Sequence, residues 1–89
     1  MVHQQIFLKG RLKMTFNIKL KEINDVYKLV NILVGFEGDV DLESGKYKVD
    51  GKSILGIFSL DLRQPIKLTY ESEKNADKLY NQLKEFIVE

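Results

Sequence analysis

The spacing of its apolar residues is the feature of this chain that most limits what it can fold into. From Ile6 to Leu20 the even positions other than Gly10 are apolar, and from Lys9 onward the odd positions are polar. A period of two predicts a β-strand with one buried face. Fifteen residues of strand would span roughly 50 Å, whereas a domain of this length has a radius of gyration of about 12 Å. The strand must therefore break or overhang.

Gly10 is the predicted bend, because glycine inside a strand pattern often marks one. We expect the first core strand to run from Met14 to Leu20. Residues 1–13 then form a basic N-terminal arm or an extra edge strand, and residues 14–89 form the main domain.

A helical period replaces the strand period in "NDVYKLVNILVGF", where apolar residues recur three and four positions apart. This spacing predicts an amphipathic helix. Asn24 is placed to cap its free amide groups. The predicted stripe consists of Val26, Leu29, Val30 and Leu33, with Val34 as a further candidate.

Two short alternating stretches, "DVDLE" and "KYKV", follow on either side of a Ser44-Gly45 turn and predict a β-hairpin. An Asp50-Gly51 turn then breaks the chain. Ser53 can accept a hydrogen bond from an amide two or three residues on, which predicts a short helix through Ser59.

The final third of the chain predicts one more strand and one more helix. "PIKLTYE" alternates, and the only proline stands at its first position, where a missing N–H does least harm. Ser72 is placed to cap the helix that follows, whose apolar stripe predicts helical structure almost to the end of the chain. That stripe consists of Ala76, Leu79, Tyr80, Leu83, Phe86 and Ile87.

The predicted order is therefore strand, helix, two strands, short helix, strand and helix (βαββαβα). Three helices can each bury one stripe if they share one face of a sheet, so the expected fold class is α+β, an open-faced sandwich of four strands with three helices on one face. The two long crossover connections are expected to place strands parallel to a neighbour.

Composition excludes several classes of protein and site. There is no cysteine, and therefore no disulfide, thiolate nucleophile or Cys-based zinc site. Apolar runs of four or five residues are far shorter than the ~20 of a membrane-spanning helix, and we expect a cytoplasmic protein. Asp39, Asp41 and Glu43 could suggest a cation site, but alternating acids opposite apolar residues are typical of the solvated face of a hairpin. We expect no metal and no cofactor.

Charge is distributed unevenly although the net charge is only +1. Residues 1–21 hold five basic residues and no acidic ones, and the remainder holds nine basic against thirteen acidic residues, a difference of −4. Such a basic segment can bind a polyanion, or it can lie against its own acidic domain. The five residues are Lys9, Arg11, Lys13, Lys19 and Lys21.

The element order, together with "KSILGIFSL" at the start of the short helix, resembles HPr, the histidine-containing phosphocarrier family of the bacterial sugar phosphotransferase system. The resemblance runs from about Met14 to Val88 and is most specific in "VDLE" followed by the start of the short helix at Ser53, close to the family's "NLKSIMGVMSL". It implies the same four-stranded sheet with three helices on one face.

The residue that carries the family's chemistry is missing. In HPr a loop of the type G-I-H-A-R-P places a histidine at the start of the first helix, where its ring takes and passes on a phosphoryl group. The corresponding "LKEINDV" has no histidine, arginine or proline, and Glu22 and Asn24 stand where the histidine and the arginine would be. An acid at a helix start is favourable for the helix dipole alone. The only histidine, His3, lies in the N-terminal arm.

Ser53 matches the position at which a dedicated kinase phosphorylates many relatives, so the resemblance makes it a candidate regulatory phosphorylation site. The simpler interpretation is that Ser53 only caps the helix. Ile54, Leu55 and Phe58 match apolar positions that dock onto partner proteins in the family. The N-terminal arm, with Phe7 and Leu8, could instead bury this short helix.

We therefore expect an HPr-like protein that is neither an enzyme nor a histidine phosphocarrier, and that acts as a regulatory or adaptor module binding a protein partner through the short helix. The alternatives are a polyanion (nucleic-acid) binder that uses the basic arm and an active phosphocarrier of the phosphotransferase system. Membrane association is not expected.

Overall fold

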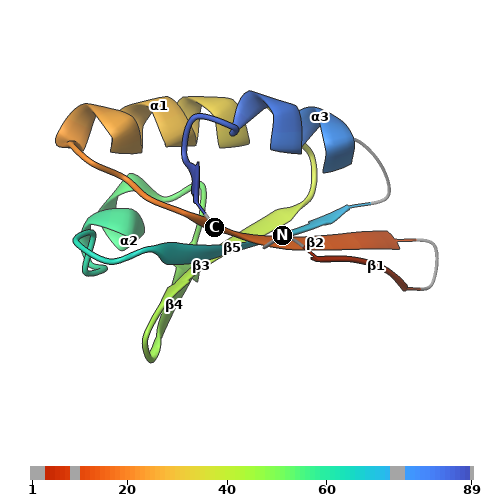
Figure 1. Ribbon diagram of the computed structural model, residues 1–89, viewed down its shortest axis with the longest axis horizontal. Coiled ribbons are helices and arrows are strands. Elements are labelled where there is room, and N and C mark those ends of the chain that lie inside the picture. The colour runs from red at the N-terminus through yellow and green to blue at the C-terminus, as the bar shows by residue number, and fades with distance from the viewer. Residues whose placement is uncertain (1–3, 9–10, 73–75, 89) are drawn as a thin grey trace.

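The computed structural model describes residues 4–8, 11–72 and 76–88 (Figure 1). Its elements follow one another in the order β1 (Gln4–Leu8), β2 (Arg11–Ile18), α1 (Ile23–Leu33), β3 (Asp39–Ser44), β4 (Tyr47–Asp50), α2 (Ile54–Phe58), β5 (Ile66–Ser72), α3 (Ala76–Gln82) and β6 (Ile87–Val88).

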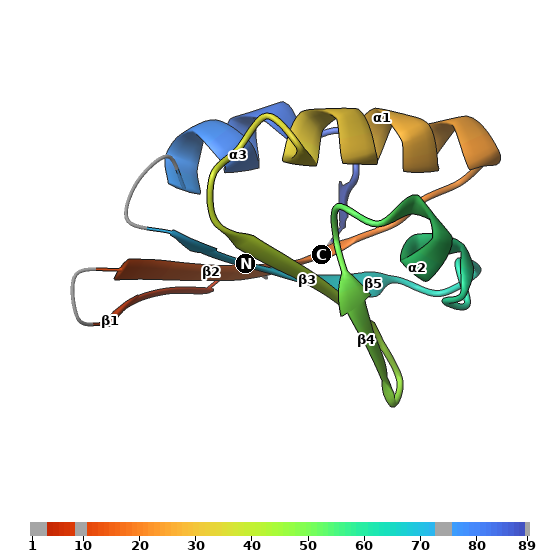
Figure 2. The same cartoon turned by 180° about the vertical axis from the view of Figure 1, so that it is seen from behind.

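The strands form one sheet in the order β1-β2-β5-β3-β4, and β6 pairs with β2 beside β1. Helices α1 and α3 lie over one face, and α2 lies at the end of the molecule beside α1 and β4 (Figures 1 and 2). The predicted α+β fold, with a sheet and three helices, is confirmed. Strands β1 and β6 extend the sheet beyond the four strands expected.

The sequence predicted that the crossover connections would place parallel strands next to each other. This prediction is wrong for the described sheet. Every strand pair in the described sheet is antiparallel. Strands β2 and β3 are parallel to each other, but β5 is inserted between them and pairs with both. The connection through α2 likewise joins β4 to β5 across β3. Each crossover therefore skips one strand, because a strand from elsewhere in the chain fills the position between.

The core lies between the sheet and the helices, as the apolar patterns predict. Even positions of β2 from Met14 onward and alternate positions of β3 and β5 point to this side and are buried, together with the stripes of α1 and α3. The fully buried side chains are Tyr70, Phe16, Met14, Ile18, Leu29, Leu33, Leu42, Ile57, Ile66, Leu68, Leu79 and Leu83. The hydroxyl of Tyr70 donates to the Glu37 carbonyl oxygen at 2.7 Å, so its polar group is satisfied at the core boundary.

The chain reverses between β1 and β2, where Leu8 pairs with Arg11. Gly10, the predicted bend, lies outside the described residues. Strand β2 begins at Arg11, earlier than the predicted Met14, because Leu12 already pairs with Ser72 of β5. The division of the chain at residue 13 stays a prediction.

The end of the chain differs from the predicted long helix. Helix α3 ends at Gln82, and Ile87 and Val88 form a strand that pairs with Ile18 and Asn17 of β2. A backbone hydrogen bond of 2.8 Å from Lys19 to Phe86 anchors the turn before it. Leu83 and Phe86 are buried as predicted, but from a turn. Residues 73–75, which separate Ser72 from α3, lie outside the described residues, and Ser72, the expected cap, ends β5.

Candidate functional site

Ser53 is the N-cap of α2, as predicted. Its backbone is extended, and its Oγ accepts a hydrogen bond of 3.2 Å from the amide of Gly56. Because α2 is only five residues long, one satisfied amide is a substantial part of its capping. The side chain of the neighbouring Lys52 reaches the α1–β3 connection, where its Nζ donates to the carbonyl oxygens of Phe36 and Gly38 at 2.7 and 3.1 Å. This cation therefore holds the α1–β3 connection.

The start of α1 holds Glu22 and Asn24, which the sequence resemblance to HPr aligns with a histidine and an arginine. Glu22, and not Asn24 as expected, is the N-cap, so the helix begins two residues earlier. The reason is Asp25, whose Oδ2 accepts from the backbone amides of Lys21 and Glu22 at 2.9 and 3.3 Å. These two hydrogen bonds fix the helix start. The positive end of the helix dipole also stabilises the negatively charged Asp25 carboxylate. Glu22 and Asn24 are both exposed.

Exposed apolar side chains gather where α1 and α2 lie side by side (Figure 2). Leu55 is 83% exposed, and Phe58 is 38% exposed. The ring of Phe58 meets Tyr27 of α1 edge-on, with ring centroids 6.1 Å apart. Ile23, one turn earlier on α1, is 65% exposed. We call Ile23, Tyr27, Leu55 and Phe58 the apolar patch, because clustered exposed apolar side chains can mark a surface that meets another molecule.

Ile54, the third expected docking residue, is half-buried and packs against the core. Ile57 is fully buried. The short helix is therefore held by one side and presents the other to solvent. Strand β1 lies at the opposite edge of the sheet from β4 and α2, so its residues Gln4–Leu8 do not cover α2.

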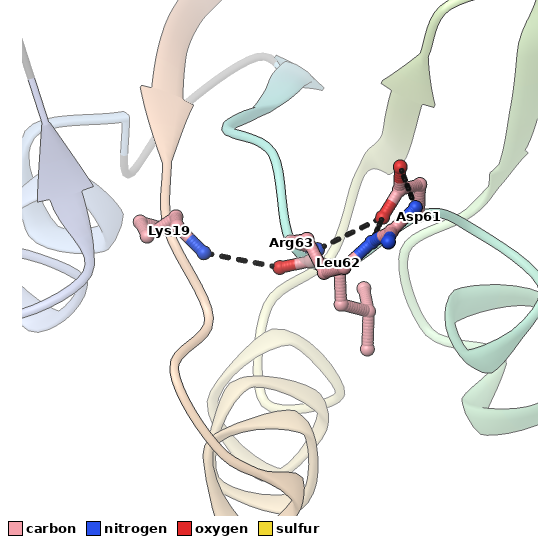
Figure 3. A network of polar contacts seen from close by, with 4 residues as sticks. All are labelled: Lys19, Asp61, Leu62 and Arg63. Carbon is pink, nitrogen blue, oxygen red and sulfur yellow. Dashed lines mark hydrogen bonds and ion pairs between the residues drawn. The ribbon is translucent and has the colours of Figure 1, made fainter.

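A polar network borders the patch next to the start of α1 (Figure 3). Lys19 donates through Nζ to the Leu62 carbonyl oxygen at 3.2 Å, and Arg63 Nε donates to Asp61 at 2.9 Å. The hydrogen bonds from the Arg63 side chain and backbone, together with its charge and that of Lys19, lower the pKa of Asp61. The same hydrogen bond with Asp61 raises the pKa of Arg63. Both groups are exposed, so they orient the loop more than they stabilise it.

An open pocket of about 400 Å³ lies between this network and α1. Leu62 and Ile23 supply apolar walls, and Lys21 and Arg63 stand at its rim. The pocket thus continues the apolar patch toward the start of α1. The residues that line it are Lys19, Leu20, Lys21, Glu22, Ile23, Leu62 and Arg63.

In the part of the chain that the structure describes, the basic residues of the N-terminal segment are divided between two places. Lys13 lies across from Glu71 on the open face of the sheet, while Lys19 is half-buried beside Leu62. Lys21 is exposed at the start of α1. Lys19 and Lys21 both line the open pocket at the start of α1, whereas Lys13 lies apart from them and pairs with an acidic residue.

Neither a metal site nor a membrane span is found in the described ranges. No three of the histidine, cysteine, aspartate and glutamate residues described are grouped so that they could hold a metal ion. Asp41 lies within 3.6 Å of Lys48 Nζ, which fits the predicted solvated face of the hairpin. No described helix is long and apolar enough to cross a membrane.

Comparison with known proteins shows which solved structures share the fold of this chain. No protein-family model and no curated protein matches the sequence. Among solved structures, the crystal structure of HPr-C-His from Thermoanaerobacter tengcongensis is similar to it, with a TM-score of 0.63 and 23% sequence identity. The match covers 82% of this chain and 86% of that one. The chain has an HPr-like fold.

The HPr-like fold brings only some of the expected site residues together. Leu55 and Phe58 share one exposed side of α2, and Phe58 reaches α1 through Tyr27. Sequence reasoning missed Tyr27 and Ile23 because they lie outside the buried stripe of α1. Their only signal is that two apolar residues stand on the face of an amphipathic helix that should be polar.

Proposed function

We propose that this chain is a protein-interaction module on an HPr-like fold, which binds a protein partner through the apolar patch and carries no phosphoryl group on a histidine. The observation that carries the proposal is the exposure of Leu55, at 83%, beside the Tyr27–Phe58 ring pair. Burying the apolar surface that these three side chains still expose would favour association by roughly 25 cal/mol per Å².

The start of α1 supports the negative half of this proposal. Glu22 occupies the N-cap where the resemblance to HPr expects a phosphorylated histidine, and the Asp25 carboxylate already accepts from two adjacent amides. A phosphoryl group arriving here would meet two carboxylates. A role as carrier is therefore disfavoured, and a role as adaptor or regulator remains.

Ser53 supplies a route for regulation of the same surface. A phosphate on its Oγ would lie at the start of α2, next to Ile54 and one turn from the apolar patch. It would carry about −1.5 to −2 charges at neutral pH. A partner that buries the patch would have to desolvate that charge, so phosphorylation would release it.

The experiment is capture from a native cell extract with the immobilised chain, compared among the parent and two variants at low and high salt. We expect one or more proteins bound by the parent chain to be lost with Leu55→Gln and retained with Val34→Gln. Val34 is the matched control, because it is also exposed but stands at the other end of α1.

Binding through apolar contacts should persist at high salt, whereas a polyanion bound by lysines would be lost steeply. Proteins captured equally by the parent and by Leu55→Gln would contradict the proposal. Capture that disappears at high salt, with nucleic acid in the eluate, would favour the polyanion alternative instead.

A further inference from the structure

Strand β1 leaves one edge of the sheet open. It pairs with β2 from Gln4↔Thr15 to Leu8↔Arg11, and it ends the strand order β1-β2-β5-β3-β4. In an antiparallel strand alternate residues point their N–H and C=O groups to opposite sides. About half of the backbone groups of β1 therefore point away from β2, toward the outside of the sheet.

The sequence of β1 lacks the features that usually protect an edge. "QQIFL" has no charged residue and no proline, although natural edge strands commonly carry one or both. Its Ile and Phe favour strand pairing. By these criteria β1 is suited to accept another strand.

The opposite edge is protected. Strand β4 is only four residues long and includes Lys48 and Asp50, and α2 packs against it. The β3–β4 hairpin also projects away from the rest of the sheet (Figure 1). Of the two edges formed by the described strands, the β1 edge is therefore the one left available to a further strand.

The chemistry of β1 favours a second copy of the chain as its occupant. Full antiparallel overlap of two β1 strands places Ile6 opposite Ile6, Gln5 opposite Phe7 and Gln4 opposite Leu8, so no charge is directly opposed by a like charge. A charged strand from another protein would find no opposite charge in β1. Because the other edge is protected, pairing between copies is two-fold symmetric and stops at a dimer.

We propose that two copies of this chain associate through antiparallel pairing of their β1 strands, forming one continuous sheet across both. Five residues a side bury far less than the roughly 1,600 Å² of a stable complex. The dimer is therefore weak and reversible. Because β1 and the helices that carry the apolar patch lie at opposite ends of the sheet (Figure 1), the dimer leaves both patches free. The dimer proposal therefore does not depend on the proposed partner.

Sedimentation of the full chain from about 10 µM to about 1 mM tests the proposal. We expect the average mass to rise toward that of a dimer with concentration. Ile6→Lys and Ile6→Glu, each alone, should weaken association roughly tenfold, because like charges then face each other at the symmetry axis. An equal mixture of the two should restore it. Tyr47→Lys, at the other edge, is the matched control and should associate like the parent.

Amide hydrogen exchange at both ends of the concentration range gives a second readout. The outward amides of β1 should become protected only at high concentration, while amides of β5 stay protected throughout. A chain that remains monomeric at about 1 mM would overturn the proposal. So would a dimer that the single Ile6 variants leave intact, or variants whose mixture fails to associate while circular dichroism shows both folded.

Discussion

At the scale of single residues, the capping hydroxyl of Ser53 has a stability role and a proposed regulatory role that substitution can separate. Ser53→Ala removes the acceptor for the Gly56 amide and should lower the free energy of unfolding by about 1 kcal/mol. Ser53→Asp keeps an acceptor there and should cost less. Urea denaturation of the three proteins measures the difference.

The same two variants should behave in the opposite way toward a partner. Ser53→Asp adds a charge next to the apolar patch and should weaken capture, whereas Ser53→Ala should leave capture unchanged. Equal capture by both would mean that the hydroxyl serves only as a cap.

Local chemistry made the Ser53 cap predictable, because the cap, the turn before it and its acceptor lie within a few residues. The cap of α1 was not predictable in the same way. Asn24 is the better cap by residue type, but the carboxylate of Asp25 reaches back to the amides of Lys21 and Glu22 and moves the helix start. The contact between Tyr27 and Phe58 joins two helices far apart in the sequence, and no local pattern specifies it.

At the scale of elements, periodicity located the core-facing strands and helices, but it did not settle how they end or which strands pair. The stripe of the last helix includes Ile87, which the structure places in β6. Helical and strand spacing cannot be distinguished over two apolar residues at a chain end. The order of strands depends on β5 lying between β2 and β3, and this arrangement is set by tertiary contacts that no local sequence pattern specifies.

The short strand β6 should contribute to stability despite its length. Deleting residues 87–89 removes the pairing with Asn17 and Ile18 and the partly buried side chain of Ile87. We expect the free energy of unfolding to fall by about 2–3 kcal/mol, from lost hydrogen bonds and apolar burial. Urea denaturation measures it, with the exposed Glu85→Ala as control. An unchanged midpoint would mean that α3 is held without β6.

At the scale of the whole molecule, the chain combines an HPr-like fold with a start of α1 whose sequence, "LKEINDV", contains no histidine. We expect no phosphorylated histidine after incubation with phosphoenolpyruvate and the first enzyme of the sugar phosphotransferase system, because a carboxylate and an amide stand at the start of α1. Acid-labile phosphate located by mass spectrometry at His3, the only histidine, would contradict this expectation. A genuine HPr incubated in parallel is the positive control.

The position of β5 also determines when the chain can fold during synthesis. Its residues pair with β2 residues that precede them by 48 positions at Ile18↔Ile66 and by 60 at Leu12↔Ser72. Until Ile66–Ser72 has left the ribosome, β2 and β3 have no strand between them, and their apolar faces lack a complete sheet. A nascent or truncated chain that ends before residue 66 is thus open to aggregation and to chaperones, and productive folding of this domain waits for the synthesis of β5.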